Sequence, residues 1–246
     1  MEAGPAVSRS LLARQQLIRE EVALASNILG IEDLGDFALG HVSVRDPEGR
    51  GVWMKASGWG FEEITPDRVV LVGWNGAVVS GEGRRHLEYP IHTEILRVRP
   101  DAQSVVHVHA PHAVAFAALE VPLRPISHEG TLFSPPDVAR FTTTGDLIIT
   151  QELGEALARA VGMRNAALMV RHGIVTVGAT LQSAVVLAIL LEHACRTQLL
   201  AMASGELRTW SDDDEALAKR AHVYAPDVVW EYLRRKLEKS QRGGGA

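Results

Sequence analysis

The chain has 246 residues, of which 46% are hydrophobic and 22% are charged, proportions typical of a globular protein rather than a collagenous or disordered one. Its 25 Lys and Arg against 30 Asp and Glu give a formal net charge of −5, which argues against a nucleic-acid-binding protein. The single cysteine, Cys195, excludes an intramolecular disulfide, and a chain of this length buries enough surface to fold without one.

The N-terminal residues and the longest apolar run indicate where in the cell the protein is located. Residues 1–14 show no cationic segment followed by an apolar stretch, so we expect no signal peptide. The longest strongly apolar run, Ala184–Leu191, is far shorter than the roughly 20 residues that span a bilayer. We therefore expect a cytoplasmic protein with no membrane and no nucleic-acid partner. We also expect one domain over residues 1–246 with a frayed tail at 241–246.

The first part of the chain predicts one helix followed by strands. Apolar side chains recur at three- and four-residue steps between Arg9 and Leu29, which is typical of an amphipathic helix. Short apolar runs separated by turn residues come next, and Asn75-Gly76 is a strong hairpin signal. We expect strands over Phe37–Arg45, Val52–Ala56, Val69–Val72 and Ala77–Val79.

The rest of the chain mixes helices and strands. Val121–Phe141 holds four prolines and little periodicity, so we expect a long loop there. Because several strands join through short turns, we expect an α/β fold with a largely antiparallel central sheet packed by helices. The expected helices are Pro90–Val98, Pro111–Leu119, Gln151–Val161, Leu181–Ala203 and Val228–Lys239. The expected strands are Ser104–His109, Asp146–Thr150, Ala166–Val170 and Ile174–Val177.

Histidines gather in one stretch, since six of the ten fall within residues 86–128. In Val106-His107-Val108-His109, a strand would point both imidazoles to the same side, where they could converge on one cation. His172, at a strand-to-strand turn beside Gly173, is the best candidate for a third ligand. Such a set leaves coordination positions open for substrate, although three unrelated polar residues at strand ends would give the same pattern.

Several other residues are candidates for the chemistry of a site. Glu88 lies just before a predicted helix, where it could act as a general acid or base or simply be favoured by the helix dipole. The turn Ser57-Gly58 follows a strand, and such turns can offer backbone N–H groups to an anion. His41 and Ser43 place polar groups on an otherwise apolar strand, which could line a pocket or a subunit contact.

The order of these motifs resembles the class II aldolase/adducin-like family, which includes fuculose phosphate aldolase and ribulose phosphate epimerase. The resemblance covers roughly residues 10–205. It is carried by Gly40-His41-Val42-Ser43, Ser57-Gly58, Glu88 with His92, Arg99-Pro100-Asp101, Val106-His107-Val108-His109, and His172-Gly173 followed by Gly178 and a long helix.

The resemblance implies a three-layer αβα fold with a central antiparallel sheet, assembled as a ring-like homotetramer with active sites near the subunit interfaces. It also implies a divalent metal ion, commonly zinc, held by His107, His109 and His172. Glu88 matches the catalytic acid/base carboxylate of the family. Manganese, cobalt and iron are the alternatives to zinc.

Two departures from the family pattern bear on the substrate. Sugar-phosphate aldolases have Asn where this chain has His41, and two serines where it has His86 and Leu87. Those positions help to hold the substrate phosphate in that family. The sequence around His41 is more similar to the branch that contains decarboxylases of hydroxy-aromatic or hydroxypyridine carboxylates and some iron-dependent members. His41 or His86, or the neighbouring Arg84 and Arg85, could then meet a carboxylate.

The expected function is therefore a metal-dependent carbon–carbon lyase acting on a small-molecule substrate. It would decarboxylate a hydroxy-(aromatic) carboxylate or cleave an aldol through a metal-stabilised enolate, with Glu88 moving the proton. Three alternatives stay open. They are a sugar or sugar-phosphate aldolase or epimerase, an iron-dependent oxygenase that uses the same three histidines, and a non-enzymatic, adducin-like interaction protein.

Overall fold

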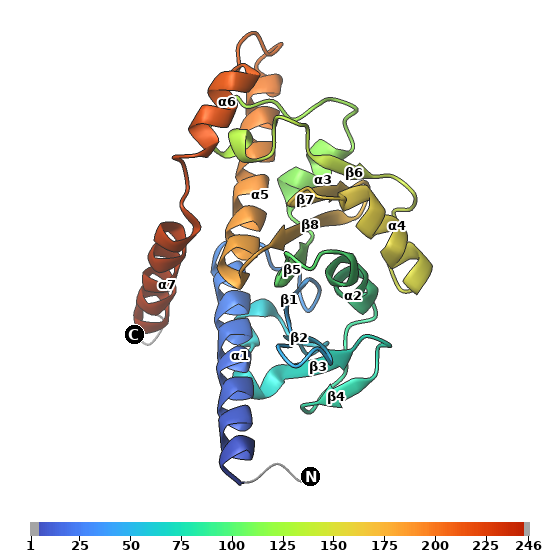
Figure 1. The fold of residues 1–246 in the computed structure, drawn as a ribbon. Coiled ribbons are helices and arrows are strands. Elements are labelled where there is room, and N and C mark those ends of the chain that lie inside the picture. Colours follow the sequence, from blue (N-terminus) through green and yellow to red (C-terminus); the bar gives the residue numbers. More distant parts are fainter. Residues whose placement is uncertain (1–4, 244–246) are drawn as a thin grey trace.

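A mixed β-sheet with helices on both faces forms the centre of the computed structural model, which describes residues 5–243 (Figure 1). The strand order is β4-β3-β2-β1-β5-β8-β7-β6, and every neighbouring pair is antiparallel except β6 and β7. The strands are β1 (His41–Arg45), β2 (Gly51–Lys55), β3 (Val69–Gly73), β4 (Val78–Ser80), β5 (Ser104–Val108), β6 (Ala139–Phe141), β7 (Ala166–Met169) and β8 (Gly173–Gly178). The predicted α/β fold with a largely antiparallel sheet is confirmed.

The helices form a layer on each face of the sheet. On one face α1 contacts β1 to β3, α3 and α5 contact β7 and β8, and α7 packs on α1 and α5. On the other face α2 contacts β2 and β5, and α4 contacts β6 and β7 (Figure 1). The helices are α1 (Pro5–Ile31), α2 (Tyr89–Val98), α3 (Pro111–Ala117), α4 (Gln151–Val161), α5 (Leu181–Ala203), α6 (Asp213–Arg220) and α7 (Pro226–Gly243).

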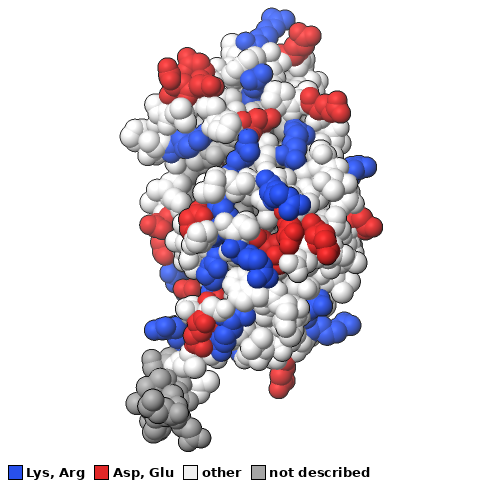
Figure 2. Space-filling view, turned by 45° about the vertical axis from the view of Figure 1, so that its right-hand side comes forward, with Lys and Arg blue, Asp and Glu red and all other residues white. Residues whose placement is uncertain are grey.

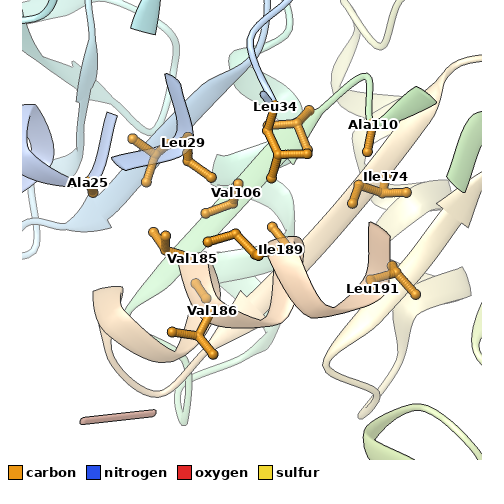
Figure 3. Close-up of a cluster of buried hydrophobic side chains, with 14 of the residues drawn as sticks. Ala25, Leu29, Leu34, Val106, Ala110, Ile174, Val185, Val186, Ile189 and Leu191 are labelled. Carbon is orange, nitrogen blue, oxygen red and sulfur yellow. The ribbon is translucent and has the colours of Figure 1, made fainter. Parts of the chain in front are cut away.

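The larger apolar core lies where α1 and α5 meet the central strands. Leu29 of α1, Val106 of β5, Ile174 of β8 and Val185 of α5 are fully buried together in it (Figure 3). Burying apolar surface yields roughly 25 cal/mol per Å², so this contact is a main source of stability for the strands that carry the site. By length and composition alone α5 could cross a membrane, but more than half of its most apolar stretch is buried in this core.

Two of the predicted strands are wrong in ways that matter for the site. The strand expected over Phe37–Arg45 begins only at His41, because Phe37 and Gly40 have positive φ values of 50° and 72° that no strand accommodates. The strand expected over Asp146–Thr150 does not form. Its alternating apolar residues imitate a strand, but the backbone N–H of Ile148 donates to the Glu88 carboxylate instead of to a neighbouring strand.

Other differences concern segments with weak sequence signals. The expected loop Val121–Phe141 contains a 3₁₀ turn at Glu129–Leu132 and the short strand β6. The helix α6 was missed because it is polar on most sides, although its N-cap residue Asp212 accepts a hydrogen bond from the Glu215 amide. Residues 241–243 of the expected frayed tail are helical, and 244–246 lie outside the described residues.

A charged side chain, Arg45, links the sheet to the end of α2 near the site. The Arg45 guanidinium at the end of β1 donates hydrogen bonds to the backbone carbonyls of Leu96, Arg99 and Ala102 at the C-terminus of α2. Leu96 lies in the last turn of α2, where the helix leaves its carbonyl unpaired, so Arg45 helps to fix how the end of α2 sits on the sheet. On the molecular face in Figure 2, acidic and basic side chains are interspersed, and neither sign forms a continuous field.

Candidate metal centre

Four side chains from separate segments meet at one end of the central strands. Glu88 is the N-cap residue of α2, His107 lies in β5, His109 follows β5, and His172 lies in the turn before β8. Each offers one ligand atom, and these four atoms all lie within 4.8 Å of one another. Glu88, His107 and His172 are almost completely shielded from solvent. The structure therefore brings together the three histidines and the carboxylate that the sequence singles out.

Gly173 allows the two histidine-bearing segments to approach. It starts β8, which pairs antiparallel with β5 so that His107 lies opposite Val175. A Cβ atom at Gly173 would lie only 2.6 Å from the carbonyl oxygen of Val108 and 3.0 Å from Cδ2 of the His109 ring. Glycine is required here because any side chain would push His172 away from the strand that carries His107.

Hydrogen bonds orient two of the imidazole rings. The Nδ1 atom of His107 lies 2.9 Å from the carbonyl oxygen of Ile174, and Nδ1 of His109 lies 2.8 Å from Oδ2 of Asp36. A carbonyl oxygen only accepts, so Nδ1 of His107 carries the proton. The Asp36 carboxylate holds the His109 ring at the corresponding nitrogen. Carboxylate or carbonyl partners of this kind are usual behind metal-bound histidines.

The donor atoms fit a divalent cation. Nε2 of His107, His109 and His172 is buried in each case and has no hydrogen-bond partner among the described residues. Buried polar atoms are normally paired, because leaving one unpaired costs about 1–3 kcal/mol. Three converging imidazole nitrogens beside a carboxylate are the kind of donor set that holds a metal ion and leaves coordination positions open.

Glu88 is held in place by contacts on both of its carboxylate oxygens. Oε1 accepts a hydrogen bond of 2.8 Å from the Ile148 amide and lies 3.4 Å from Nε2 of His172, while Oε2 lies 3.8 Å from Nε2 of His107. Burial alone would raise the pKa of Glu88, but the contacts with His172, His107 and the amide outweigh it and lower this pKa to about 2. The carboxylate is therefore ionised at neutral pH.

A second histidine cluster, formed by His41, His86 and His92, adjoins the first. The centroid of the His41 ring lies 5.0 Å from that of His107, 4.5 Å from His86 and 4.8 Å from His92. The contact with His107 follows from the sheet register, because His41 of β1 lies directly opposite His107 of β5. Burial lowers the pKa of His86 and of His92 to about 3 and holds that of His41 well below its usual range, so this cluster is neutral.

The other residues predicted to bind substrate have different surroundings. The Ser43 hydroxyl is fully buried and lies 2.6 Å from Nδ1 of His92. The Ser57 amide donates to the carbonyl of Arg84, and Gly58 occupies a left-handed conformation with φ of 93°. Within residues 5–243, no hydrogen bond joins Ser57 or Gly58 to Glu88 or to the three histidines of the metal centre. Their roles stay predictions.

Sequence analysis did not identify two residues, Asp36 and Lys55, that hold segments next to the metal centre in place. Asp36 holds His109, and its loop is anchored by Lys55, whose buried ammonium donates to the carbonyls of Ala38 and Trp59. Burial lowers the pKa of Lys55 to about 8. The sequence carried no signal for the Asp36 contact, because Asp36 precedes the strands and its partner lies 73 residues away.

Comparison with known proteins gives a consistent result. Residues 20–199 match the family profile described as the Class II Aldolase and Adducin N-terminal domain. The decarboxylase NovR of Streptomyces niveus is 34% identical over 174 residues, which are 70% of this chain and 64% of that protein, so the match spans less than two thirds of NovR. The 3,4-dihydroxyphthalate decarboxylase of Arthrobacter keyseri is 31% identical over 80% of this chain and 84% of its own length.

The fold has a close counterpart among solved structures. L-fuculose 1-phosphate aldolase from Glaciozyma antarctica PI12 superimposes with a TM-score of 0.82 at 30% sequence identity, over 95% of this chain and 93% of that one. The same architecture thus occurs in a protein named as an aldolase, whereas two relatives by sequence are named as decarboxylases.

Proposed function

The chain belongs to the class II aldolase and adducin family, and we propose that it is a metal-dependent lyase that decarboxylates a hydroxy-carboxylate, with zinc as the expected ion. The observation that carries this proposal is the convergence of three unpartnered imidazole Nε2 atoms on one carboxylate. A scaffold protein has no use for such a set, so the arrangement argues against a purely structural role.

His107, His109 and His172 would hold the cation. A divalent cation bound there supplies Lewis acidity, which polarises a substrate oxygen and stabilises the negative charge that develops as a carbon–carbon bond breaks. The protein's own contribution is orientation, since Ile174 and Asp36 fix two of the three rings before any ligand arrives.

Glu88 would move the proton. The Ile148 amide donates to one carboxylate oxygen and the other lies near His107, so the ionised group is held beside the histidines that would bind the cation. It would take up a proton that the substrate gives up and return it to the carbon after carbon dioxide leaves. The electron pair of the broken bond then forms the new carbon–hydrogen bond.

Cleavage of an aldol is the second candidate, favoured by the likeness to the L-fuculose 1-phosphate aldolase structure. The two reactions need the same stabilised oxygen and the same proton carrier. We place decarboxylation first because His41 and His86 occupy positions where sugar-phosphate aldolases have amide and hydroxyl groups for the phosphate. These two histidines, with Ser43 and the Ser57-Gly58 turn, stay our candidates for holding the rest of the substrate.

The proposal includes a cytoplasmic homotetramer with the site near a subunit interface. Support comes from two exposed apolar side chains beside site residues. Phe37, next to Asp36, is 92% exposed, and Leu87, next to Glu88, is 64% exposed. Burying these side chains against a neighbouring subunit would be favourable. A sedimentation experiment that finds only monomer would contradict this assembly.

The first test is elemental analysis of protein purified without chelators or a metal-affinity tag. We expect about one zinc, manganese or cobalt ion per chain, lost in a His107→Ala/His109→Ala variant and kept in the exposed control His222→Ala. Predominant iron would instead favour an oxygenase and call for an oxygen-uptake assay. Absence of metal after add-back would remove the mechanism.

The second test separates the two lyase reactions. The metal-loaded protein is offered 3,4-dihydroxyphthalate with detection of carbon dioxide, and L-fuculose 1-phosphate with detection of aldehyde. Carbon dioxide release that is lost in the double histidine variant supports the decarboxylase. Aldehyde release alone would show that the aldolase reading is correct.

A further inference from the structure

Two adjoining cavities lie where α5 and α6 meet the loop that leads into β6 (Figure 1). The first, of about 390 Å³, is bounded by that loop, by residues 163–166 at the start of β7, and by Arg220 at the end of α6. The second, of about 310 Å³, lies between α5 and the segment that joins α6 to α7. Leu132, Asn165 and Arg220 line both cavities, so the two are direct neighbours.

The walls of both cavities are largely apolar. In the first, Phe133 and Val138 are buried side chains of the wall, and Met163 is 75% exposed. In the second, Leu187 and Leu190 of α5 line one side. Pockets for small organic ligands measure roughly 300–1,000 Å³, so each cavity has room for such a molecule.

The charged side chains of these walls are all basic. Arg164 lines the first cavity and Arg220 lines both, whereas no Asp or Glu of the described chain, residues 5–243, lines either one. The Glu129 carboxylate nearby already accepts a hydrogen bond of 2.7 Å from the hydroxyl of Tyr224. The cavities therefore attract an anionic group and repel a cationic one.

Arg220 is fixed in position without a ligand. Its Nε donates to the carbonyl oxygen of Thr131 and its Nη2 to that of Pro135, both at 2.6 Å. A guanidinium group has five N–H donors, so these two bonds leave three for other acceptors. Both partners are neutral, and no carboxylate in the part of the chain that the structure describes forms an ion pair with Arg220. The cavities thus share an oriented positive charge that has no counter-ion.

We propose that the two cavities form a second ligand-binding site, which takes an organic carboxylate with a compact apolar body. Arg220 binds the carboxylate through its remaining N–H donors, and the apolar body packs beside Phe133 and Met163. A guanidinium matches a carboxylate bidentately, and one that is already oriented loses less conformational entropy on binding. The site is separate from the metal centre, because His172 lies beyond the opposite end of β7.

Binding can be measured with a fluorescent dye and a matched pair of competitors. The dye is 8-anilinonaphthalene-1-sulfonate, an organic anion that becomes fluorescent in apolar surroundings. We expect the zinc-loaded protein to bind it saturably, and 2-naphthoate to displace it about ten-fold or more better than 2-naphthamide, which has the same rings without the charge. Equal displacement by the amide would overturn the assignment of an anion. A protein that binds neither dye nor naphthoate would show that the cavities are closed, for example by a neighbouring subunit, and would also overturn the proposal.

Variants locate the binding. Arg220→Gln removes the charge, and Asn165→Trp narrows the junction of the cavities from an exposed position. We expect each to weaken 2-naphthoate binding by about ten-fold or more, whereas Arg235→Gln, at an exposed position of α7, should leave it unchanged. A loosened fold would bind more dye, so reduced dye binding by Arg220→Gln is not explained by loosening. Unchanged affinity in both cavity variants would overturn the proposal.

A further control separates this site from the metal centre, where a bound ion could also attract a carboxylate. We expect the His107→Ala/His109→Ala variant to bind 2-naphthoate as tightly as the unmutated protein. Loss of binding in that variant would assign the carboxylate to the metal centre and overturn the second site. The measurement needs no turnover, so the inference is tested even if the proposed lyase activity is absent.

Discussion

Asp36 and His109 are joined by a 2.8 Å contact between Oδ2 and Nδ1, although 73 residues separate them in the chain. The contact fixes the orientation of the His109 ring, whose centroid lies 5.1 Å from that of His107 and 5.3 Å from that of His172. A loop that precedes β1 thus orients a proposed metal ligand that follows β5.

Asp36→Asn should weaken zinc binding without unfolding the protein. The amide is neutral and can present its NH₂ group to Nδ1, so the preferred tautomer of His109 is lost. Loss of such a supporting group typically costs about 10–100-fold in metal affinity. Competition with a chromophoric chelator measures the change, and Asp33→Asn in the same loop is the control. Equal zinc affinity in wild type and Asp36→Asn would show that Asp36 does not orient the ligand.

Glu88→Gln should separate proton transfer from metal binding. The glutamine oxygen can still accept the hydrogen bond from the Ile148 amide, so the fold around α2 should persist. We expect zinc content to be retained and kcat for carbon dioxide release to fall by about 10²–10⁴-fold. Glu94→Gln, another buried carboxylate on α2, should keep most of the activity. The assignment of Glu88 as proton carrier is wrong if the zinc-loaded variant remains nearly as active as wild type.

Gly173→Ala should disrupt both stability and the metal centre. The added Cβ would stand 2.6 Å from the Val108 carbonyl oxygen, a contact that only backbone movement can relieve. Overpacking of this kind costs about 1–3 kcal/mol. We expect a lower midpoint in urea unfolding and weaker zinc binding. The control is Gly35→Ala, where the nearest atom is 4.0 Å away. Similar stability of the two variants would contradict the requirement for glycine at position 173.

Stability should fall in acid because of Asp46. This buried carboxylate accepts hydrogen bonds from Arg50 and from the Trp53 indole. Burial opposes ionisation, but these bonds outweigh it and lower the pKa of Asp46 below its unfolded value. The contribution is therefore fully present above the unfolded pKa near 4 and is lost as pH falls through the folded pKa.

The Asp46→Asn variant isolates this contribution. We expect it to lower the free energy of unfolding by about 1–3 kcal/mol at pH 7, because bonds to a charged acceptor are lost. The difference from wild type should shrink as the pH drops from 4 toward 2. Urea titrations at several pH values measure it. A constant difference across that range would mean that the ionisation of Asp46 does not stabilise the fold.

Much of the secondary structure was predictable because local signals agree with tertiary packing. The helices α4 and α5 and the strand β5 combine a clear hydrophobic period with turn residues at their ends. Asp146–Thr150 shows the limit of this reasoning, because its alternation of apolar residues satisfies the strand pattern while no neighbouring strand is available. Periodicity reports which side chains can be buried, but a strand also needs a partner.

The candidate site likewise combines residues that a local pattern identifies with contacts that depend on the tertiary structure. The pair His107 and His109 and the glycine after His172 are local features of the sequence that made these histidines candidates for metal binding. The acidic residue before α2, Glu88, was a candidate general acid or base on the same local grounds. Only the tertiary structure decided their surroundings: the β1–β5 register places His41 against His107, and a loop with left-handed residues brings Asp36 to His109. Strand register and long-range hydrogen bonds depend on the packing of the whole chain, because no local pattern encodes which residues will face each other across a sheet.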